Sequence, residues 1–100
     1  MATPEGRVKD KVKKALRDIH AYWFMPVQNG MGSPSLDFLI CYNGRFFGIE
    51  TKAPGKTKPT PRQANTMRAI ENAGGGTFLV HDEQSLEYAI TEMQECEWGY

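Results

Sequence analysis

The chain has 100 residues, of which 40% are hydrophobic and 24% are charged. This length and composition predict one folded domain over residues 1–100 and exclude a disordered or collagenous segment. The longest apolar stretch, Ala21 to Val27, is too short to span a membrane, and the N-terminus lacks the apolar core of a secretory signal. We therefore expect a cytoplasmic protein with no membrane partner.

The two cysteines, Cys41 and Cys96, indicate neither a disulfide framework nor a metal site. Two are too few for a disulfide scaffold, and they lack the clustered spacing of zinc ligands. We expect both to be reduced thiols. Cys41 lies in an apolar run, where we expect it to behave as a small hydrophobic residue.

The net charge of zero conceals a strong asymmetry along the chain. Residues 1–68 carry twelve basic and five acidic groups, which gives +7, whereas residues 69–100 carry seven acidic and no basic groups, which gives −7. Such a chain can present a basic face to phosphate groups while its acidic end points elsewhere. A solvated lysine-rich helix explains the charge equally well.

The N-terminal segment predicts a helix. Thr3 suits the N-cap, Pro4 suits the first helical position, and Glu5 places an acid in the first turn. Apolar residues then recur at helical spacing, at Val8, Val12, Leu16 and Ile19. The cations between them, Lys9 included, are expected on the solvated side of this helix.

Three strands are expected next. The aromatic segment from Ala21 to Val27 predicts the first, and Leu36 to Tyr42 and Arg45 to Lys52 predict a hairpin joined by Asn43-Gly44. Both faces of the hairpin are largely apolar: one carries Leu36, Phe38, Ile40, Phe47 and Ile49, and the other carries Leu39, Cys41 and Phe46. We expect the hairpin to be central in a sheet that is covered on both faces.

The second half of the chain predicts two helices around one strand. Thr60-Pro61-Arg62-Gln63 has a capping-box pattern and begins a helix to about Ala73, which residues 74–76, all glycine, should end. Thr77 to His81 predicts a strand, and Ser85 to about Cys96 an acidic helix. The order α-β-β-β-α-β-α is typical of an α/β sandwich with a mixed sheet flanked by helices.

The hairpin register brings two acids together. If Asn43-Gly44 forms a two-residue turn, Tyr42 faces Arg45, and further along the strands Asp37 faces Glu50. Opposed like charges destabilise a sheet, and a divalent cation removes the conflict. Mg²⁺ prefers hard oxygen ligands such as these carboxylates and the Thr51 carbonyl.

Lys52 shares the predicted face of Glu50, since side chains alternate along a strand. Beside a phosphodiester-cleaving centre, its ammonium could orient the attacking water and offset phosphate charge. The alternative is structural: Asp37 lies in solvent at a strand end, and Glu50 pairs with Lys52 on an exposed face.

Two further polar residues have two interpretations each. Glu5 lies on the packing stripe of the first helix, where it complements the helix dipole or serves the acid pair. Gln63 lies at the start of the second helix, where it completes the capping box or serves the same site.

A basic cluster follows Lys52, made of Lys56, Lys58 and Arg62. It lies at the start of the second helix, where backbone N–H groups also favour anions, so we expect DNA phosphates to bind there. The aromatic strand around Trp23 could stack on bases, but a core position is the more common role of such a segment.

Together these segments resemble the virus-type replication-repair nuclease (VRR-NUC) domain of the PD-(D/E)xK superfamily, in the stand-alone form found in phages and bacteria. The segments that carry the resemblance, which covers most of the chain, are Glu5 and residues 32–37, 48–52 and 59–63. The chain differs from the usual signature because Asp37 follows Leu36 rather than a proline, with Pro34 three residues before Asp37.

The resemblance implies an αβββαβα restriction-endonuclease-like core and a metal-dependent endonuclease. It implies that Asp37, Glu50 and the Thr51 carbonyl bind Mg²⁺ or Mn²⁺, that Lys52 acts at the nucleophilic water, and that Glu5 and Gln63 support them. Products with a 5′-phosphate and a 3′-hydroxyl would follow.

Stand-alone members of this family are associated with homodimers that cut branched DNA such as Holliday junctions. The resemblance therefore implies a homodimer, branched DNA as the partner, and the host cell cytoplasm if the protein is phage-encoded. Two alternatives stay open: a nucleic-acid-binding module that keeps the fold without cleavage, and a structural or partner-binding protein.

Overall fold

The computed structural model describes residues 3–27 and 34–95. In this part of the chain, the elements in order are α1 (Pro4–Asp18), β1 (Tyr22–Phe24), β2 (Phe38–Tyr42), β3 (Arg45–Thr51), α2 (Pro61–Asn72), β4 (Gly76–Val80) and α3 (Glu83–Glu95). The predicted α/β order is confirmed. The sequence also predicts a loop over residues 28–34, of which residues 28–33 lie outside the described residues, as does the cysteine at position 96.

The sheet is mixed, as predicted, with the strand order β1-β2-β3-β4. The first two pairs of neighbours are antiparallel, and β3 and β4 are parallel. The tight turn between β2 and β3 has Asn43 at φ 53° and Gly44 at φ 84°, both in the left-handed region that a two-residue hairpin turn requires. Tyr42 therefore pairs with Arg45, as the sequence predicts.

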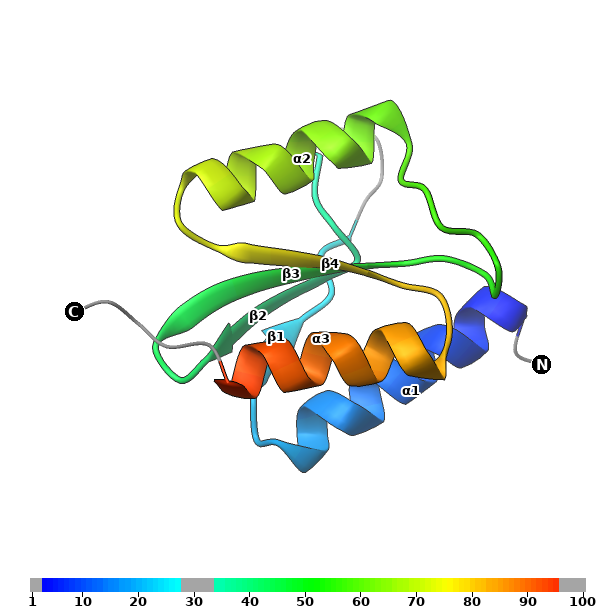
Figure 1. The fold of residues 1–100 in the computed structure, drawn as a ribbon, viewed down its shortest axis with the longest axis horizontal. Helices are drawn as coiled ribbons and strands as arrows, with labels where there is room; N and C mark the ends of the chain where they lie inside the picture. The colour runs from blue at the N-terminus through cyan, green and yellow to red at the C-terminus, as the bar shows by residue number, and fades with distance from the viewer. Residues whose placement is uncertain (1–2, 28–33, 96–100) are drawn as a thin grey trace.

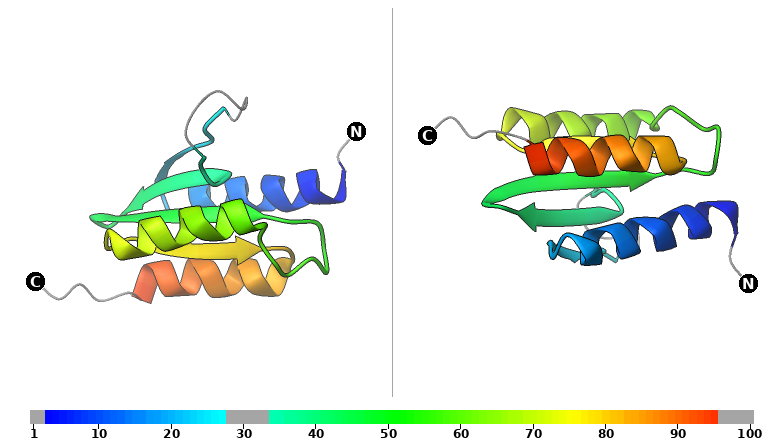
Figure 2. Two further views of the ribbon diagram at one scale, coloured as in Figure 1. Left: turned by 90° about the horizontal axis from the view of Figure 1, so that it is seen from above. Right: turned by 60° about the horizontal axis from the view of Figure 1, so that its bottom comes forward.

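The helices cover the two faces of the sheet unequally (Figures 1 and 2). Helices α1 and α3 lie side by side on one face, and α2 lies on the other. The core lies under α1 and α3, where the most deeply buried side chains include Val12, Leu16, Phe38, Ile40, Phe47, Ile49, Val80 and Met93. Side chains alternate along β2 and β3, so their buried members gather on the face under α1 and α3.

The face under α2 is only partly covered, which corrects the expectation of a sheet buried on both sides. Helix α2 has no buried residue. Phe46 is 44% exposed, and Cys41 is exposed rather than packed as a core residue. Leu36 is buried but contacts the Gly48 position on this face, so it does not belong with Phe38 as predicted.

The first strand is shorter than predicted and ends at Phe24, two residues before Pro26, which cannot donate to a strand ladder. Of its three residues only Trp23 packs against the core, where its ring lies 5.6 Å from that of Phe38. Tyr22 is 72% exposed and Phe24 is 49% exposed, so within this strand the core position expected for the aromatic residues applies to Trp23 alone.

The acidic helix lies beside the basic one. Lys11 on α1 and Glu83 on α3 form an ion pair of 2.9 Å, so the acidic end of the chain does not point away from the basic end. Across residues 3–27 and 34–95, the structure contains no helix with the length and apolar character needed to cross a membrane.

Candidate functional site

The acid pair, Asp37 and Glu50, lies where the hairpin ladder ends. Strand β2 begins at Phe38, which pairs with Ile49, and the next position along each strand holds an acid. The Asp37 N–H donates to Glu50 Oε1 at 3.1 Å, so the structure brings the two residues together. The register that predicted this juxtaposition is the one observed.

Strand β2 begins only at Phe38, so the Asp37 side chain supplies the hydrogen-bond acceptor that a paired strand would offer Thr51. Its Oδ2 accepts hydrogen bonds from the Thr51 N–H at 3.1 Å and from the Thr51 hydroxyl at 2.6 Å. Thr51 is buried, and β2 offers it no backbone acceptor, so the carboxylate satisfies a group that would otherwise be unpaired. Asp37 Oδ1 accepts no hydrogen bond from the described residues.

Glu50 is only 4% exposed. Burial and, after it, the charge of Asp37 raise the pKa of its carboxyl group to about 7, although the Asp37 N–H and the ammonium groups of Lys52 and Lys9 act to lower it. The ionised form of Glu50 is therefore disfavoured in the metal-free protein. A bound cation would favour the ionised form of Glu50.

Lys9 corrects the sequence interpretation of α1. We expected it on the solvated side, but its side chain is 26% exposed. Its ammonium lies 2.7 Å from Glu5 Oε2 and 3.7 Å from Asp37 Oδ2. Glu5 thus contacts Lys9, and Lys9 in turn lies beside Asp37. Glu5 also provides the predicted acid in the first turn of α1.

Gln63 makes both the capping contacts and a contact with the acid pair. Its side-chain Oε1 accepts a hydrogen bond from the Thr60 N–H at 2.9 Å, and its backbone N–H donates to Thr60 Oγ1 at 3.1 Å. These two bonds complete the capping box of α2. Its Nε2 donates to Glu50 Oε2 at 2.5 Å. The Thr60 N–H is a donor and Glu50 Oε2 is an acceptor, so the positions of oxygen and nitrogen in the Gln63 side-chain amide are determined.

The backbone of β3 directs the Thr51 carbonyl towards the acid pair. The Lys52 N–H donates to the Val80 carbonyl at 2.9 Å, so the backbone groups of Lys52 face β4. Backbone groups of successive strand residues point to alternate sides, and the Thr51 N–H meets Asp37. The Thr51 carbonyl therefore faces the same side as the Asp37 carboxylate.

Lys52 follows the end of β3 and influences Glu50 electrostatically. Within the described part of the chain, its ammonium forms no hydrogen bond or ion pair. Its ammonium is therefore an uncommitted cation close enough to Glu50 to lower the pKa of that carboxyl group.

The donor set fits Mg²⁺ or Mn²⁺. Two carboxylates and a carbonyl are hard oxygen ligands, and these ions commonly keep waters in their other positions. In residues 3–27 and 34–95 no group of three or more His, Cys, Asp or Glu side chains has metal-site geometry. A cation here would thus rely on Asp37, Glu50, Thr51 and water.

The basic cluster lies beyond the acid pair, between β3 and α2. Lys56, Lys58 and Arg62 are exposed, and none of their side chains forms an ion pair with a described residue. The N-terminal ends of α1, α2 and α3 all lie at the end of the sheet where β3 and β4 finish (Figures 1 and 2). Helix N-termini favour anions, so this end of the molecule suits phosphate groups.

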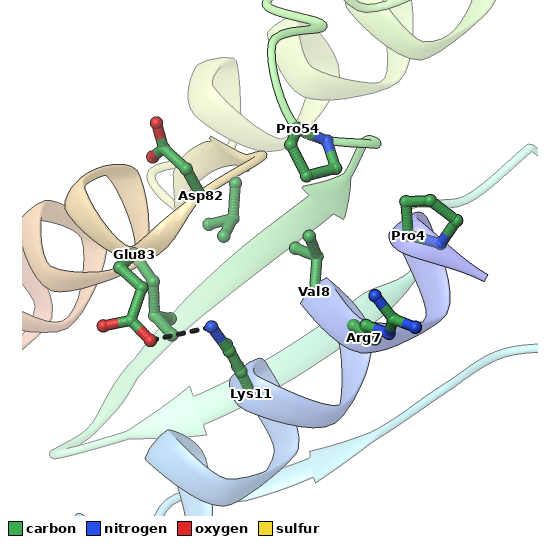
Figure 3. Close-up of a pocket in the computed structure, with 9 residues that line it drawn as sticks. Pro4, Arg7, Val8, Lys11, Pro54, Asp82 and Glu83 are labelled. Atoms are coloured by element: carbon green, nitrogen blue, oxygen red, sulfur yellow. Dashed lines mark ion pairs between the residues drawn. The ribbon is translucent and has the colours of Figure 1, made fainter. Parts of the chain in front are cut away.

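A separate cavity of about 280 Å³ lies between α1, α3 and the loop after β3 (Figure 3). Pro4, Val8 and Pro54 form part of its apolar wall, and the Lys11–Glu83 ion pair crosses one side. None of the acid pair, Lys52 or Gln63 lines it.

Neither protein-family models nor curated proteins match the sequence. A solved structure described as "VRR_NUC domain" matches 96% of this chain and 100% of its own chain, with a TM-score of 0.76 and 22% sequence identity. The chain has the fold of a VRR_NUC domain. The resemblance to this family is confirmed at the level of the fold.

Proposed function

We propose that this VRR_NUC-fold chain is a metal-dependent endonuclease that hydrolyses phosphodiester bonds in DNA. The observation that carries the proposal is the acid pair at the end of the central hairpin. The Asp37 N–H donates to Glu50, and the Thr51 N–H donates to Asp37. A fold that only needed stability would gain little from burying Glu50 beside Asp37, because a buried carboxyl group is costly to ionise.

In this proposal Asp37, Glu50 and the Thr51 carbonyl hold Mg²⁺ or Mn²⁺. The bound ion would supply charge neutralisation at the phosphate and a lowered pKa of water. Gln63 fixes the orientation of Glu50 through its amide. Lys52 orients the attacking water and offsets phosphate charge, and the attack leaves a 5′-phosphate and a 3′-hydroxyl.

The basic cluster and the three helix N-termini support DNA as the substrate, because both features favour phosphate groups without reading a base sequence. Replacing Lys56 and Lys58 with Ala should weaken DNA binding for all sequences and flatten its salt dependence.

We extend the proposal to branched DNA such as Holliday junctions and to a homodimer. Each chain offers one acid pair, and symmetric resolution of a junction needs two cuts. Gel filtration with light scattering tests the dimer independently of cleavage.

The decisive experiment incubates the protein with labelled four-way junctions, flaps and duplexes in Mg²⁺, Mn²⁺ or EDTA. We expect metal-dependent products from the wild type and at least about a hundredfold slower cleavage by Lys52→Ala, with DNA binding retained. Lys14→Ala is the matched control, because Lys14 pairs with Asp18 on the exposed side of α1. Full activity of Lys52→Ala would remove this lysine from the mechanism.

A second candidate is a non-catalytic DNA-binding module. The exposed basic cluster alone favours it, since phosphate contacts need no acid pair. DNA binding without products in any metal would support the module and contradict the nuclease. Absence of both binding and cleavage would favour a structural or partner-binding role.

A further inference from the structure

Lys9 is the one basic side chain of α1 that contacts the acid pair among the described residues. Its side chain is 26% exposed, whereas that of Lys14 on the same helix is 75% exposed. Its ammonium is bonded to Glu5 at 2.7 Å and stands 3.7 Å from Asp37 Oδ2. The helix thus places a fixed positive charge beside the proposed cation ligands.

We propose that Lys9 is a built-in counter-ion, which compensates the acid pair in the metal-free protein and weakens its affinity for a divalent cation. The inference rests on the proposed function, since it takes Asp37 and Glu50 as the cation site. In this role Lys9 does not bind the cation itself. It acts through the acid pair and determines how tightly the pair binds a divalent cation.

The geometry explains why Lys9 compensates Asp37 without blocking it. At 3.7 Å the ammonium is too far from Oδ2 for a hydrogen bond, and that oxygen already accepts two from Thr51. The stronger contact is with Glu5, which anchors the lysine to its own helix. Asp37 Oδ1 accepts no hydrogen bond from the described residues, and the Asp37 side chain is 17% exposed.

The charge of Lys9 is permanent near neutral pH. Burial lowers the pKa of the ammonium, but the hydrogen bond to Glu5 and the charges of Asp37, Glu5 and Glu50 together raise it above its ordinary value. A permanent positive charge 3.7 Å from Asp37 Oδ2 attracts that carboxylate and repels a divalent ion bound to it. Removing it should therefore affect the metal-free and metal-bound states in opposite directions.

The test compares Lys9→Met with the wild type by calorimetric titration with Mn²⁺ and by thermal unfolding in EDTA. We expect Lys9→Met to bind Mn²⁺ at least about fivefold more tightly and to unfold at a lower temperature in EDTA. Lys14→Met, the matched control, should change neither quantity. Equal or weaker Mn²⁺ binding by Lys9→Met, with normal wild-type binding, would overturn the Lys9 proposal and leave the nuclease proposal intact.

Absence of Mn²⁺ binding by the wild type would overturn both proposals. If Lys9→Met does not fold, the lysine side-chain signals of the wild type are followed by NMR during titration with Mg²⁺. The Lys9 signal should shift and that of Lys14 should not, and an unchanged Lys9 signal at saturating Mg²⁺ would overturn the inference.

Discussion

The two faces of the sheet differ in how completely their apolar side chains are buried and in whether they carry an ionisable group. The face under α1 and α3 is excluded from water, and Phe38 and Ile49 on it are fully buried. The face under α2 leaves Phe46 44% exposed and carries the buried acid Glu50. Both faces are built from the same two strands, in strict alternation.

The difference shows that, in a domain of 100 residues, one face of the sheet can provide most of the stability while the other carries the candidate site. Burial of apolar surface is concentrated on one face, where it provides most of the free energy of folding. The opposite face can then accommodate a carboxylate whose pKa burial has raised to about 7. The predictions below separate these two contributions.

The largest effect should come from the covered face. Ile49→Ala removes a fully buried side chain and should lower the free energy of unfolding by about 3 kcal/mol. Phe46→Ala on the opposite face, although it removes a larger side chain, should cost only about 1 kcal/mol because the ring is already partly in water. Urea denaturation of both variants measures the contrast, and equal losses would contradict the division between the faces.

Glu50 should make stability depend on pH in the opposite sense to an ordinary surface carboxylate. Its folded-state pKa of about 7 lies above the ordinary value of 4.5, so protonation favours the folded state. This contribution is complete below about pH 4.5 and is lost as the pH rises through about 7. We expect the metal-free protein to lose on the order of 2 kcal/mol of stability between pH 5 and pH 8.

The control for that pH dependence is Glu50→Gln in EDTA. It should lack the loss, whatever its absolute stability, because its amide cannot ionise and must place a donor against either the Asp37 N–H or the Gln63 amide. Identical slopes for the wild type and this variant between pH 5 and pH 8 would show that Glu50 does not titrate in this range. Saturating Mg²⁺ should also abolish the slope.

The smallest stability effects should come from the start of α2. Thr60→Ala and Gln63→Ala each break the capping box and should each cost about 1 kcal/mol. Only Gln63→Ala also removes the donor to Glu50. We therefore expect cleavage to fall about tenfold in Gln63→Ala and less than twofold in Thr60→Ala, with similar melting temperatures. Equal activities would restrict Gln63 to its capping role.

Local sequence signals were sufficient to predict the order of elements and the register. Asn43-Gly44 adopts left-handed backbone angles that suit a two-residue turn, and this turn alone determines which residues of the hairpin face each other. The opposition of Asp37 and Glu50 follows from it without knowledge of the tertiary structure. The capping box of α2 and the glycine that follows this helix are local signals of the same kind.

Tertiary placement could not be predicted from the same signals. Lys9 lies one position beyond Val8, just outside the apolar stripe, and its contact with Asp37 depends on where α1 crosses the sheet. The spacing of Glu5 and Lys9, four residues apart on a helix, predicts their ion pair but not its position beside the acid pair. The exposure of Cys41 and Phe46 likewise depends on how little of the sheet α2 covers.

The most direct test of the central claim, that the acid pair binds a divalent cation, is the thermal unfolding of Asp37→Asn with and without Mn²⁺. The asparagine oxygen can still accept from Thr51, and the repulsion of Glu50 is removed, so in EDTA the variant should melt within a few degrees of the wild type. We predict that Mn²⁺ raises the melting temperature of the wild type and leaves that of Asp37→Asn unchanged. Equal stabilisation of both proteins by Mn²⁺, or of neither, would contradict the account.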